Sequence, residues 1–261
     1  VEPLVAGHDF GRCCVTLVNR RVGRVFAGHA DQLGEEERIK DRVHSRTHGG
    51  GWSQANYQRS SDEEAEAHLR RVSSEVYRSW REQPFQTLVL GGPVEDVARF
   101  EEVLHNDLRS KLRPERLDLD VEVAHESDVR AAMAVLLGRA EQERKQATLE
   151  ELQARRARGE RAAVGLADTL EALTERRGET LVLTRTFRAP GGRCPQCGLL
   201  SPAGAESCPA DGTRMQTTDN IREAAVQSAV LQDAEILVIE DPPDTPEALV
   251  PVQGIGALLR F

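Results

Sequence analysis

Three cysteines and one aspartate in the last third of the chain have the spacing of a metal site. Cys194 and Cys197 lie in a CPQCG turn, and Cys208 and Asp211 lie in a CPADG turn that repeats it. Asp211 therefore stands where a fourth cysteine would complete the pattern. Two such turns can direct their ligands to one tetrahedral zinc ion, which predicts a structural zinc knuckle over residues 193–213.

Two questions about this knuckle stay open at the level of sequence. A carboxylate is a rarer ligand of structural zinc than a thiolate is, so Asp211 is only a candidate for the fourth ligand. The two turns could also fold without metal, as the remnant of such a site. A catalytic zinc is not expected, because no general base neighbours the turns. Cys13 and Cys14 are adjacent on a predicted strand, so they face opposite sides of the sheet and are expected to be small buried residues.

A basic, glycine-rich segment over residues 42–61 is the second candidate for function. Its sequence, RVHSRTHGGGWSQANYQRSS, contains no acidic residue, although the chain has a net charge of −9. Arginines neutralise phosphates, aromatic rings stack on unpaired bases, and glycines allow the backbone to approach a ligand closely. The candidate RNA-binding residues are Arg42, Arg46, His48, Gly49, Gly50, Gly51, Trp52, Ser53, Gln54, Tyr57 and Arg59.

The residue types in this segment argue against several activities and leave one plain alternative to RNA binding. That alternative is an unstructured loop tip whose charge is accidental. A Walker phosphate loop is not supported, because no GK[ST] follows the glycines. Ser53 lacks the strand–GxSxG–helix context of a hydrolase nucleophile. A two-metal nuclease needs several carboxylates on its core strands, and the strand sequences RCCVTLV and LVLGGP contain none.

The elements that must position these residues form two α/β domains, residues 1–126 and residues 127–261. Ser61 and Glu64 have capping-box spacing, which predicts that a long amphipathic helix begins at Ser61 and ends near Gln83. Thr218 is a candidate N-cap of a later helix. In the first domain we expect strands at 12–18, 22–26, 84–93 and 119–124 and helices at 61–83 and 94–112. In the second we expect helices at 127–161, 161–173 and 218–233 and strands at 179–187 and 235–240.

Composition narrows the class of protein. The 261 residues are 39% hydrophobic and 30% charged, which is typical of a globular chain of one or two domains. No apolar run reaches the length of a membrane helix, so no membrane association is expected. The odd number of cysteines and the absence of a visible secretion signal favour the cytoplasm.

The order of these pieces resembles the second and third domains of the archaeo-eukaryotic class I release factor and Pelota family. The resemblance covers nearly the whole chain: a strand hairpin, a Gly-Gly loop followed by SQANYQR and a long helix, LVLGGP, GLADTLEAL and a terminal GIGALLRF. The bacterial, Balon-like branch is most similar, because it also carries a cysteine knuckle. The family's amino-terminal decoding domain has no counterpart here, so either the sequence is part of a longer protein or the decoding contacts are lost.

The resemblance implies a ribonuclease-H-like first domain and, for the second, an α/β/α sandwich with an inserted zinc-knuckle subdomain. It further implies binding to the ribosome, through ribosomal RNA and P-site tRNA, and a translational GTPase such as elongation factor Tu as a partner.

The loop departs from the family at its catalytic position. In release factors Gly-Gly-Gln enters the peptidyl-transferase centre and positions water for attack on peptidyl-tRNA. Here Trp52 follows Gly50-Gly51, and Gln54 comes two residues later. We therefore favour a factor that occupies the A site of idle bacterial ribosomes during hibernation or stress without chemistry. The alternative is a rescue factor that hydrolyses peptidyl-tRNA with Gln54.

Overall fold

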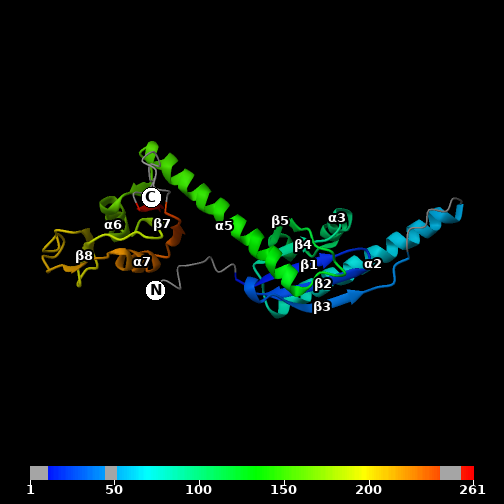
Figure 1. Cartoon of the computed structure of the whole chain (residues 1–261). Coiled ribbons are helices and arrows are strands. Elements are labelled where there is room, and N and C mark those ends of the chain that lie inside the picture. Colours follow the sequence, from blue (N-terminus) through cyan, green and yellow to red (C-terminus); the bar gives the residue numbers. More distant parts are fainter. Residues whose placement is uncertain (1–10, 45–51, 242–253) are drawn as a thin grey trace. The chain divides into compact units, whose positions relative to one another are not determined.

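The chain forms two compact units, Asp9–Ala140 and Glu141–Phe261. The computed structural model describes residues 11–44, 52–241 and 254–261, and of residues 52–58 it describes the backbone alone. Both units combine helices with β-sheets, which confirms the predicted mixed α/β class (Figure 1). Within the described ranges, no helix is long and apolar enough to cross a membrane.

The first unit is built on a five-stranded sheet in the order β3-β2-β1-β4-β5. β1 pairs antiparallel with β2 and parallel with β4, so the sheet is mixed. The strands are β1 (Cys13–Val18), β2 (Val22–Gly28), β3 (Gly34–Lys40), β4 (Thr87–Gly91) and β5 (Leu112–Leu117). The helices are η1 (Ala30–Gln32), α2 (Trp52–Glu82), α3 (Val94–Val103), α4 (Asn106–Arg109) and the first half of α5 (Glu126–Ala157).

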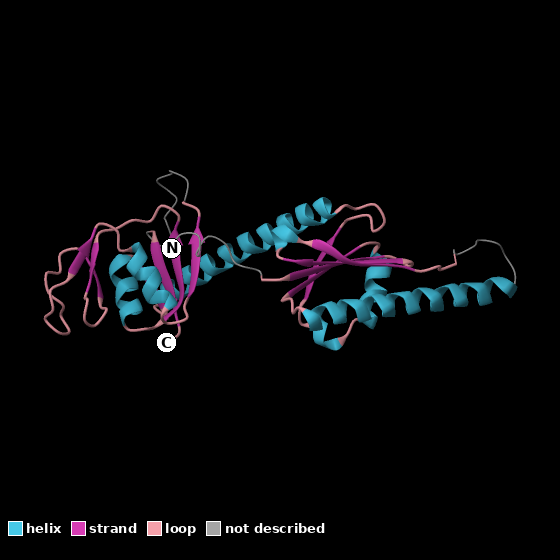
Figure 2. Ribbon diagram, turned by 90° about the horizontal axis from the view of Figure 1, so that it is seen from below, coloured by secondary structure: helices cyan, strands magenta, loops and turns pink. Residues whose placement is uncertain are grey.

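Helices cover both faces of this sheet (Figure 2). Along β1, Cys13, Val15 and Leu17 are buried in a core shared with α5. Cys14 and Val18 are buried in a second core with α2 and α3. The prediction that the two cysteines face opposite sides is therefore confirmed. The predicted apolar face of α2 also lies in the second core, because its leucine and valines recur every three or four residues.

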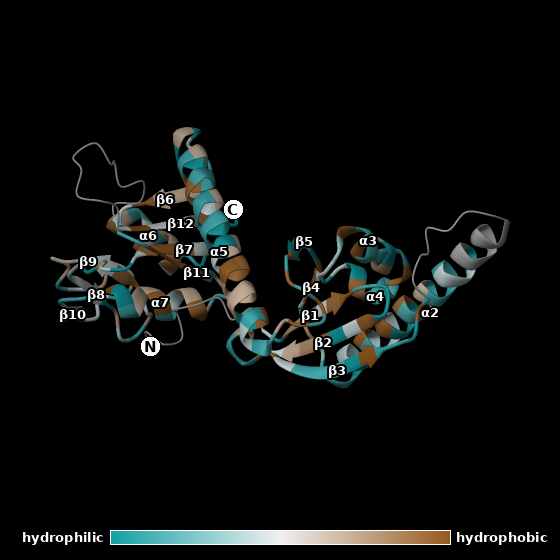
Figure 3. Cartoon of the chain, turned by 45° about the vertical axis from the view of Figure 1, so that its right-hand side comes forward, coloured by the Kyte–Doolittle hydropathy of each residue, from teal (hydrophilic) through white to brown (hydrophobic). Residues whose placement is uncertain are grey.

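β3 was not predicted, because its sequence GEEERIK is charged. Figure 3 shows this edge strand as hydrophilic, beside the apolar strands of the sheet. The sheet accommodates it through an ion pair with the neighbouring strand: the buried Arg24 guanidinium donates to both carboxylate oxygens of Glu35 at 2.6–2.8 Å. Charged residues on an edge strand also discourage pairing with other chains.

Two predictions between α3 and α5 were wrong. The helix expected over 94–112 ends at Val103, and only the single turn α4 follows it. The strand expected over 119–124 is a turn, because Asp120 Oδ1 accepts the backbone N–H groups of Glu122 and Val123 at 2.8 and 3.2 Å. The strand of this region is instead β5, which contains Pro114 and lies at the sheet edge, where proline is tolerated.

The division between the units falls inside α5, whereas we expected a boundary at residues 126–127 with the whole helix in the second unit. Val129, Met133 and Leu137 are buried in the core of the first unit. Leu152, later in the same helix, is buried against the sheet of the second unit. The first half of the helix therefore completes the first unit, and its later half covers the second.

The second unit has a four-stranded sheet in the order β11-β7-β12-β6 and a separate three-stranded sheet in the order β10-β8-β9. The strands are β6 (Ala162–Val164), β7 (Gly178–Thr184), β8 (Gly191–Arg193), β9 (Leu200–Pro202), β10 (Gln216–Thr218), β11 (Glu235–Ile239) and β12 (Ile255–Leu259). The helices are the later half of α5, α6 (Leu166–Thr174) and α7 (Arg222–Val230). β7 is buried on both faces, with Leu181 and Leu183 towards the two helices and Val182 towards α5.

Two helix starts in this unit were predicted too early. Residues 162–164 form β6, which pairs with β12, and Gly165 then adopts a positive φ of 90° before α6 begins. Thr218 belongs to β10 and pairs with Gly191, so it is not an N-cap. The side chain of Asn220 accepts the N–H of Arg222 at the start of α7 instead.

The assignment of the first half of α5 to the first unit can be tested with a matched pair of alanine substitutions. Met133 is fully buried, whereas the Val135 side chain is 74% exposed. Met133→Ala should destabilise the first unit by about 2–5 kcal/mol, because it leaves a cavity in the core. Val135→Ala should change little. The measurement is amide hydrogen exchange of β1 in the full chain; equal protection in both variants would contradict the assignment.

Candidate functional site

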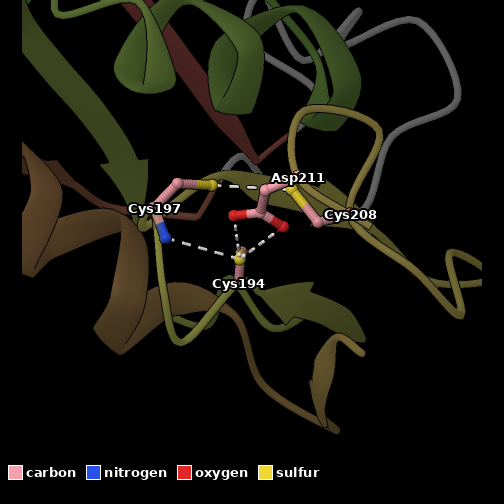
Figure 4. Close-up of side chains that lie close together, drawn as sticks. All are labelled: Cys194, Cys197, Cys208 and Asp211. Atoms are coloured by element: carbon pink, nitrogen blue, oxygen red, sulfur yellow. Dashed lines mark hydrogen bonds between the residues drawn. The ribbon is translucent and has the colours of Figure 1, made fainter. Parts of the chain in front are cut away.

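The structure brings the four predicted metal ligands together (Figure 4). Their ligand atoms all lie within 4.8 Å of one another. The sulfur atoms of Cys197 and Cys208 are 3.5 Å apart, and the Asp211 carboxylate oxygens lie 3.4 and 3.7 Å from the sulfur of Cys194. No disulfide joins the cysteines of the described residues.

The two turns that carry the ligands have the same backbone geometry. In the first, the N–H of Gly198 donates to the carbonyl of Cys194 at 3.0 Å; in the second, the N–H of Gly212 donates to the carbonyl of Cys208 at 2.9 Å. The two glycines have φ of 79° and 74°, a left-handed conformation that other residues adopt at a cost. Asp211 therefore occupies the place in the second turn that Cys197 occupies in the first.

The surrounding hydrogen bonds favour negative charge on two of the four groups. The backbone N–H of Thr213 donates to Asp211 at 2.9 Å and holds the pKa of that carboxyl well below its usual range. Burial raises the pKa of the Cys194 thiol, but the backbone N–H groups of Cys197 and Gln196 and the Cys197 side chain together outweigh it and lower that pKa below its ordinary value. The backbone N–H of Leu199 lowers the pKa of Cys197. Desolvation and the side chains of Cys194, Cys208 and Asp211 together outweigh this hydrogen bond and raise the pKa to about 12.

This donor set fits a tetrahedral ion that prefers sulfur. An ion about 2.3 Å from each sulfur requires ligand atoms about 3.8 Å apart, close to the 3.4–3.7 Å contacts found here. The local core is small, because the buried members of its cluster are Cys194, Cys208 and Met215. A bound ion would therefore contribute directly to the folding of this subdomain.

The glycine-rich segment is described only in part. Arg46, His48, Gly49, Gly50 and Gly51 lie outside the described residues. Trp52, Ser53, Gln54 and Tyr57 belong to the first turns of α2, of which the backbone is described. Arg42 and Arg59 are both exposed, one on each side of the glycines.

The predicted capping box at Ser61 is wrong, because α2 begins earlier, at Trp52. The side chains of Ser61 and Glu64 instead bind the backbone of His44, the last described residue before the glycines. The Ser61 hydroxyl donates to the carbonyl of His44 at 2.6 Å, and the Glu64 carboxylate accepts the N–H of His44 at 3.0 Å. Arg20, in the β1–β2 turn, donates to Ser61 and to the carboxylate of Asp62 at 2.9–3.1 Å. We call Arg20, His44, Ser61, Asp62 and Glu64 the loop clasp.

A second contact fixes the same chain segment three residues earlier. The carboxylate of Asp41 lies 2.6 Å from Nδ1 of His68, which is fully buried on α2, and 2.7 Å from the guanidinium of Arg71. Arg20, His44 and this pairing could not be predicted from the sequence, because all of these contacts join residues distant along the chain. The only signal was the capping-box spacing of Ser61 and Glu64, which we assigned to the wrong backbone groups.

Comparisons with solved structures show which fold the chain shares. The chain is similar to archaeal Pelota in a ribosome-bound model with ABCE1, with 14% identity, a TM-score of 0.55, and coverage of 95% of this chain and 61% of that one. It also matches S. cerevisiae Dom34 (11%, TM-score 0.48, coverage 95% and 63%) and the archaeal translation termination factor aRF1 (16%, TM-score 0.38, coverage 97% and 64%). The chain thus spans less than two thirds of the length of these proteins.

The model of bacterial archaeo-eukaryotic release factor family 10 matches residues 1–144. The chain belongs to this family, which confirms the resemblance drawn from its sequence. No curated protein matches the chain.

The loop clasp makes a testable prediction about pH. The backbone N–H of His44, and then its ring, hold the pKa of Glu64 below its ordinary value of 4.5. Because the pKa is depressed in the folded chain, the clasp is stabilised above pH 4.5 and loses this contribution as the pH falls through the depressed value. The chemical shift of the His44 amide should follow this titration.

Two neighbouring glutamates provide the variant and its control. Glu64→Gln should abolish the titration of the His44 amide and speed its hydrogen exchange several-fold. Glu66→Gln should leave both unchanged, since Glu66 pairs with Arg70 on the exposed side of α2. A His44 amide that is insensitive to Glu64→Gln would show that the clasp does not hold the segment in solution.

Proposed function

We propose that this protein is a ribosome-associated translation factor that places residues 42–61 in the A site, near the peptidyl-transferase centre. The observation that carries the proposal is the family match, which spans residues 1–144 and therefore includes the whole segment and its clasp. The proposed setting is a bacterial cytoplasm in which idle ribosomes are protected during hibernation or stress.

The charges around the segment support ribosomal RNA as its target. Arg42 and Arg59 are exposed, and the first turn of α2 contains no acidic residue. A helix N-terminus carries a partial positive charge and unpaired N–H groups, so both features attract phosphate. The loop clasp binds His44, near one end of the segment, to α2. This attachment lowers the conformational entropy that the segment loses when it becomes ordered on RNA.

We propose two further contacts of the ribosome-bound protein from its resemblance to release factors and Pelota. P-site tRNA would lie beside the segment in the peptidyl-transferase centre. A translational GTPase of the elongation factor Tu class would deliver the protein to the A site. The archaeal Pelota that shares the fold is described as ribosome-bound, which supports the ribosome as a partner for this chain also.

The alternative is a rescue factor that releases the stalled peptide. Its support is Gln54, which supplies an amide near the position of the family's catalytic glutamine. We favour the factor without chemistry, because Trp52 directly follows the glycines and offers a stacking surface instead of a group that can orient water. In this function Trp52 packs against a base of ribosomal RNA or of the tRNA end.

We also propose that Cys194, Cys197, Cys208 and Asp211 bind one structural zinc ion. The support is the spacing of the ligand atoms, the duplicated turn geometry, and the small apolar core around them. Zinc would hold the three-stranded sheet together and would take no part in a reaction.

Two substitutions at the start of α2 separate the proposed functions. If Trp52 stacks on a base, Trp52→Ala should weaken ribosome binding about ten- to a hundred-fold, since such stacking contributes about 1–3 kcal/mol. Gln54→Ala should then change binding little, and the wild type should release no peptide from P-site peptidyl-tRNA.

The rescue function predicts the opposite pattern. The wild type would release peptide, and Gln54→Ala would bind normally but lose release, as expected for a group that acts only in the transition state. Binding is measured by ribosome pelleting and release by hydrolysis of labelled peptidyl-tRNA on the same ribosomes. If no variant binds ribosomes, including the wild type, the proposed function itself fails.

The zinc site is tested by elemental analysis and competition with a chelator. The wild type should retain about one zinc per chain, as expected for a closed four-ligand site. Asp211→Ala should weaken zinc binding by more than about tenfold, because even outer partners of metal ligands change affinity about 10–100-fold. Asp211→Cys should retain or tighten binding. Asp219→Ala, which removes a nearby exposed carboxylate, is the control, and an affinity loss equal to that of Asp211→Ala would exclude Asp211 as a ligand.

A further inference from the structure

We infer that Cys197 and Cys208 form an oxidisable pair: peroxide converts them to a disulfide and expels the metal. The inference rests on the zinc site proposed above, and it adds a modification site whose reactant is a hydroperoxide. It is carried by the unequal environments of the four ligand groups.

Within this cluster, one contact joins two sulfur atoms and another joins a sulfur to a carboxylate. The sulfur atoms of Cys197 and Cys208 are 3.5 Å apart. The sulfur of Cys194 contacts a carboxylate, at 3.4 Å from Asp211, and it also accepts the backbone N–H of Cys197 at 3.5 Å. A site with four cysteines could form two disulfides, whereas this one can form a single disulfide and must leave one thiol beside an aspartate that cannot be oxidised.

Exposure to solvent determines which sulfur reacts first with peroxide. Cys197 is exposed, whereas Cys194 and Cys208 are buried at 0% and 2% exposure. Oxidants in solution therefore reach Cys197, and Cys208 lies directly behind it. This arrangement of an accessible thiolate beside a resolving cysteine is the one that favours reversible oxidation. The metal keeps both sulfurs as thiolates, which is the form that reacts with peroxide.

The chemistry balances with hydrogen peroxide as the only other reactant. The Cys197 thiolate attacks one peroxide oxygen, the O–O bond breaks, and a sulfenic acid and one hydroxide form. The Cys208 thiolate then attacks the Cys197 sulfur, the S–S bond forms, the S–O bond breaks, and a second hydroxide leaves. Two thiolates lose two electrons in total, and the peroxide is reduced to two hydroxide ions.

Loss of two ligands removes the metal and loosens the subdomain. The disulfide sulfurs no longer carry charge, so Cys194 and Asp211 remain as two ligands, too few for a structural site. The strands β8, β9 and β10 have three residues each, and the buried cluster beside them is small. Such a sheet depends on the metal, and we expect its amide protection to fall on oxidation.

The experiment treats the reduced, zinc-loaded full chain with hydrogen peroxide. Zinc release is followed with a chromogenic chelator, and disulfides are mapped by mass spectrometry of peptides. About one zinc per chain should be released as a Cys197–Cys208 disulfide forms, and dithiothreitol should reduce this disulfide and allow zinc to bind again. Cys13 and Cys14 are fully buried on β1, where peroxide in solution does not reach them, so they are internal controls that should stay unmodified.

Two serine substitutions form a matched pair, since each removes one ligand and weakens zinc binding. Cys194→Ser retains the reactive pair and should still form the Cys197–Cys208 disulfide. Cys208→Ser removes the resolving sulfur, so Cys197 should stop at sulfenic acid or be oxidised further. If both variants misfold, the mapping on the wild type decides alone.

The outcomes distinguish this inference from the proposed zinc site. Reduced wild type without zinc would contradict the zinc site, while the disulfide mapping would still decide the pairing. A protein that holds zinc and resists peroxide, or one that forms a Cys194–Cys197 disulfide instead, would overturn the inference and leave the zinc site in place.

Discussion

The antiparallel pairing of β1 with β2 is the contact on which the position of the glycine-rich segment depends. The turn between the strands is held by Asn19, whose side-chain oxygen accepts the N–H groups of Arg21 and Val22 at 2.9 and 2.8 Å. This turn directs Arg20 to Ser61 and the residue after it on α2. Since β1 is buried on both faces, a shift of its register by one residue would exchange its two cores. The pairing therefore fixes the turn, and the turn fixes the clasp.

The cysteine knuckle has little apolar burial to hold it in place, in contrast to the first unit. Apolar burial determines how the elements of the first unit pack. The three-stranded sheet of the second unit instead has short strands and a small buried cluster. Close backbone packing supplies part of its stability, because a Cβ on Gly191 would lie only 2.9 Å from side-chain atoms of Ile221. The remaining constraint comes from the contacts among the four candidate ligand groups, so the chemistry of these groups and the local fold cannot change independently.

The elements with an apolar pattern were predictable from sequence, and those held by polar contacts were not. β1, β4, β7 and β11 are short apolar runs, and the face of α2 has a clear helical period. β3 was missed because ion pairs such as that of Glu35 replace apolar burial. The candidate metal ligands could be picked out because their spacing is local, with each turn spanning four residues. The clasp was missed because Arg20 and Ser61 are 41 residues apart and their contact follows from the tertiary fold.

The start of α2 bears on whether the proposed factor performs chemistry. Trp52 is the first residue of the helix, so Gln54 lies on regular helical backbone. Two residues of helix displace Gln54 by about 3 Å along the axis from Trp52, the position at which the resemblance places the family's catalytic glutamine. Positional errors of about 1 Å in a catalytic group can cost about a hundredfold in rate. To act in hydrolysis, Gln54 would therefore need the first turn of α2 to unwind on the ribosome, whereas a stacking role for Trp52 requires no such change.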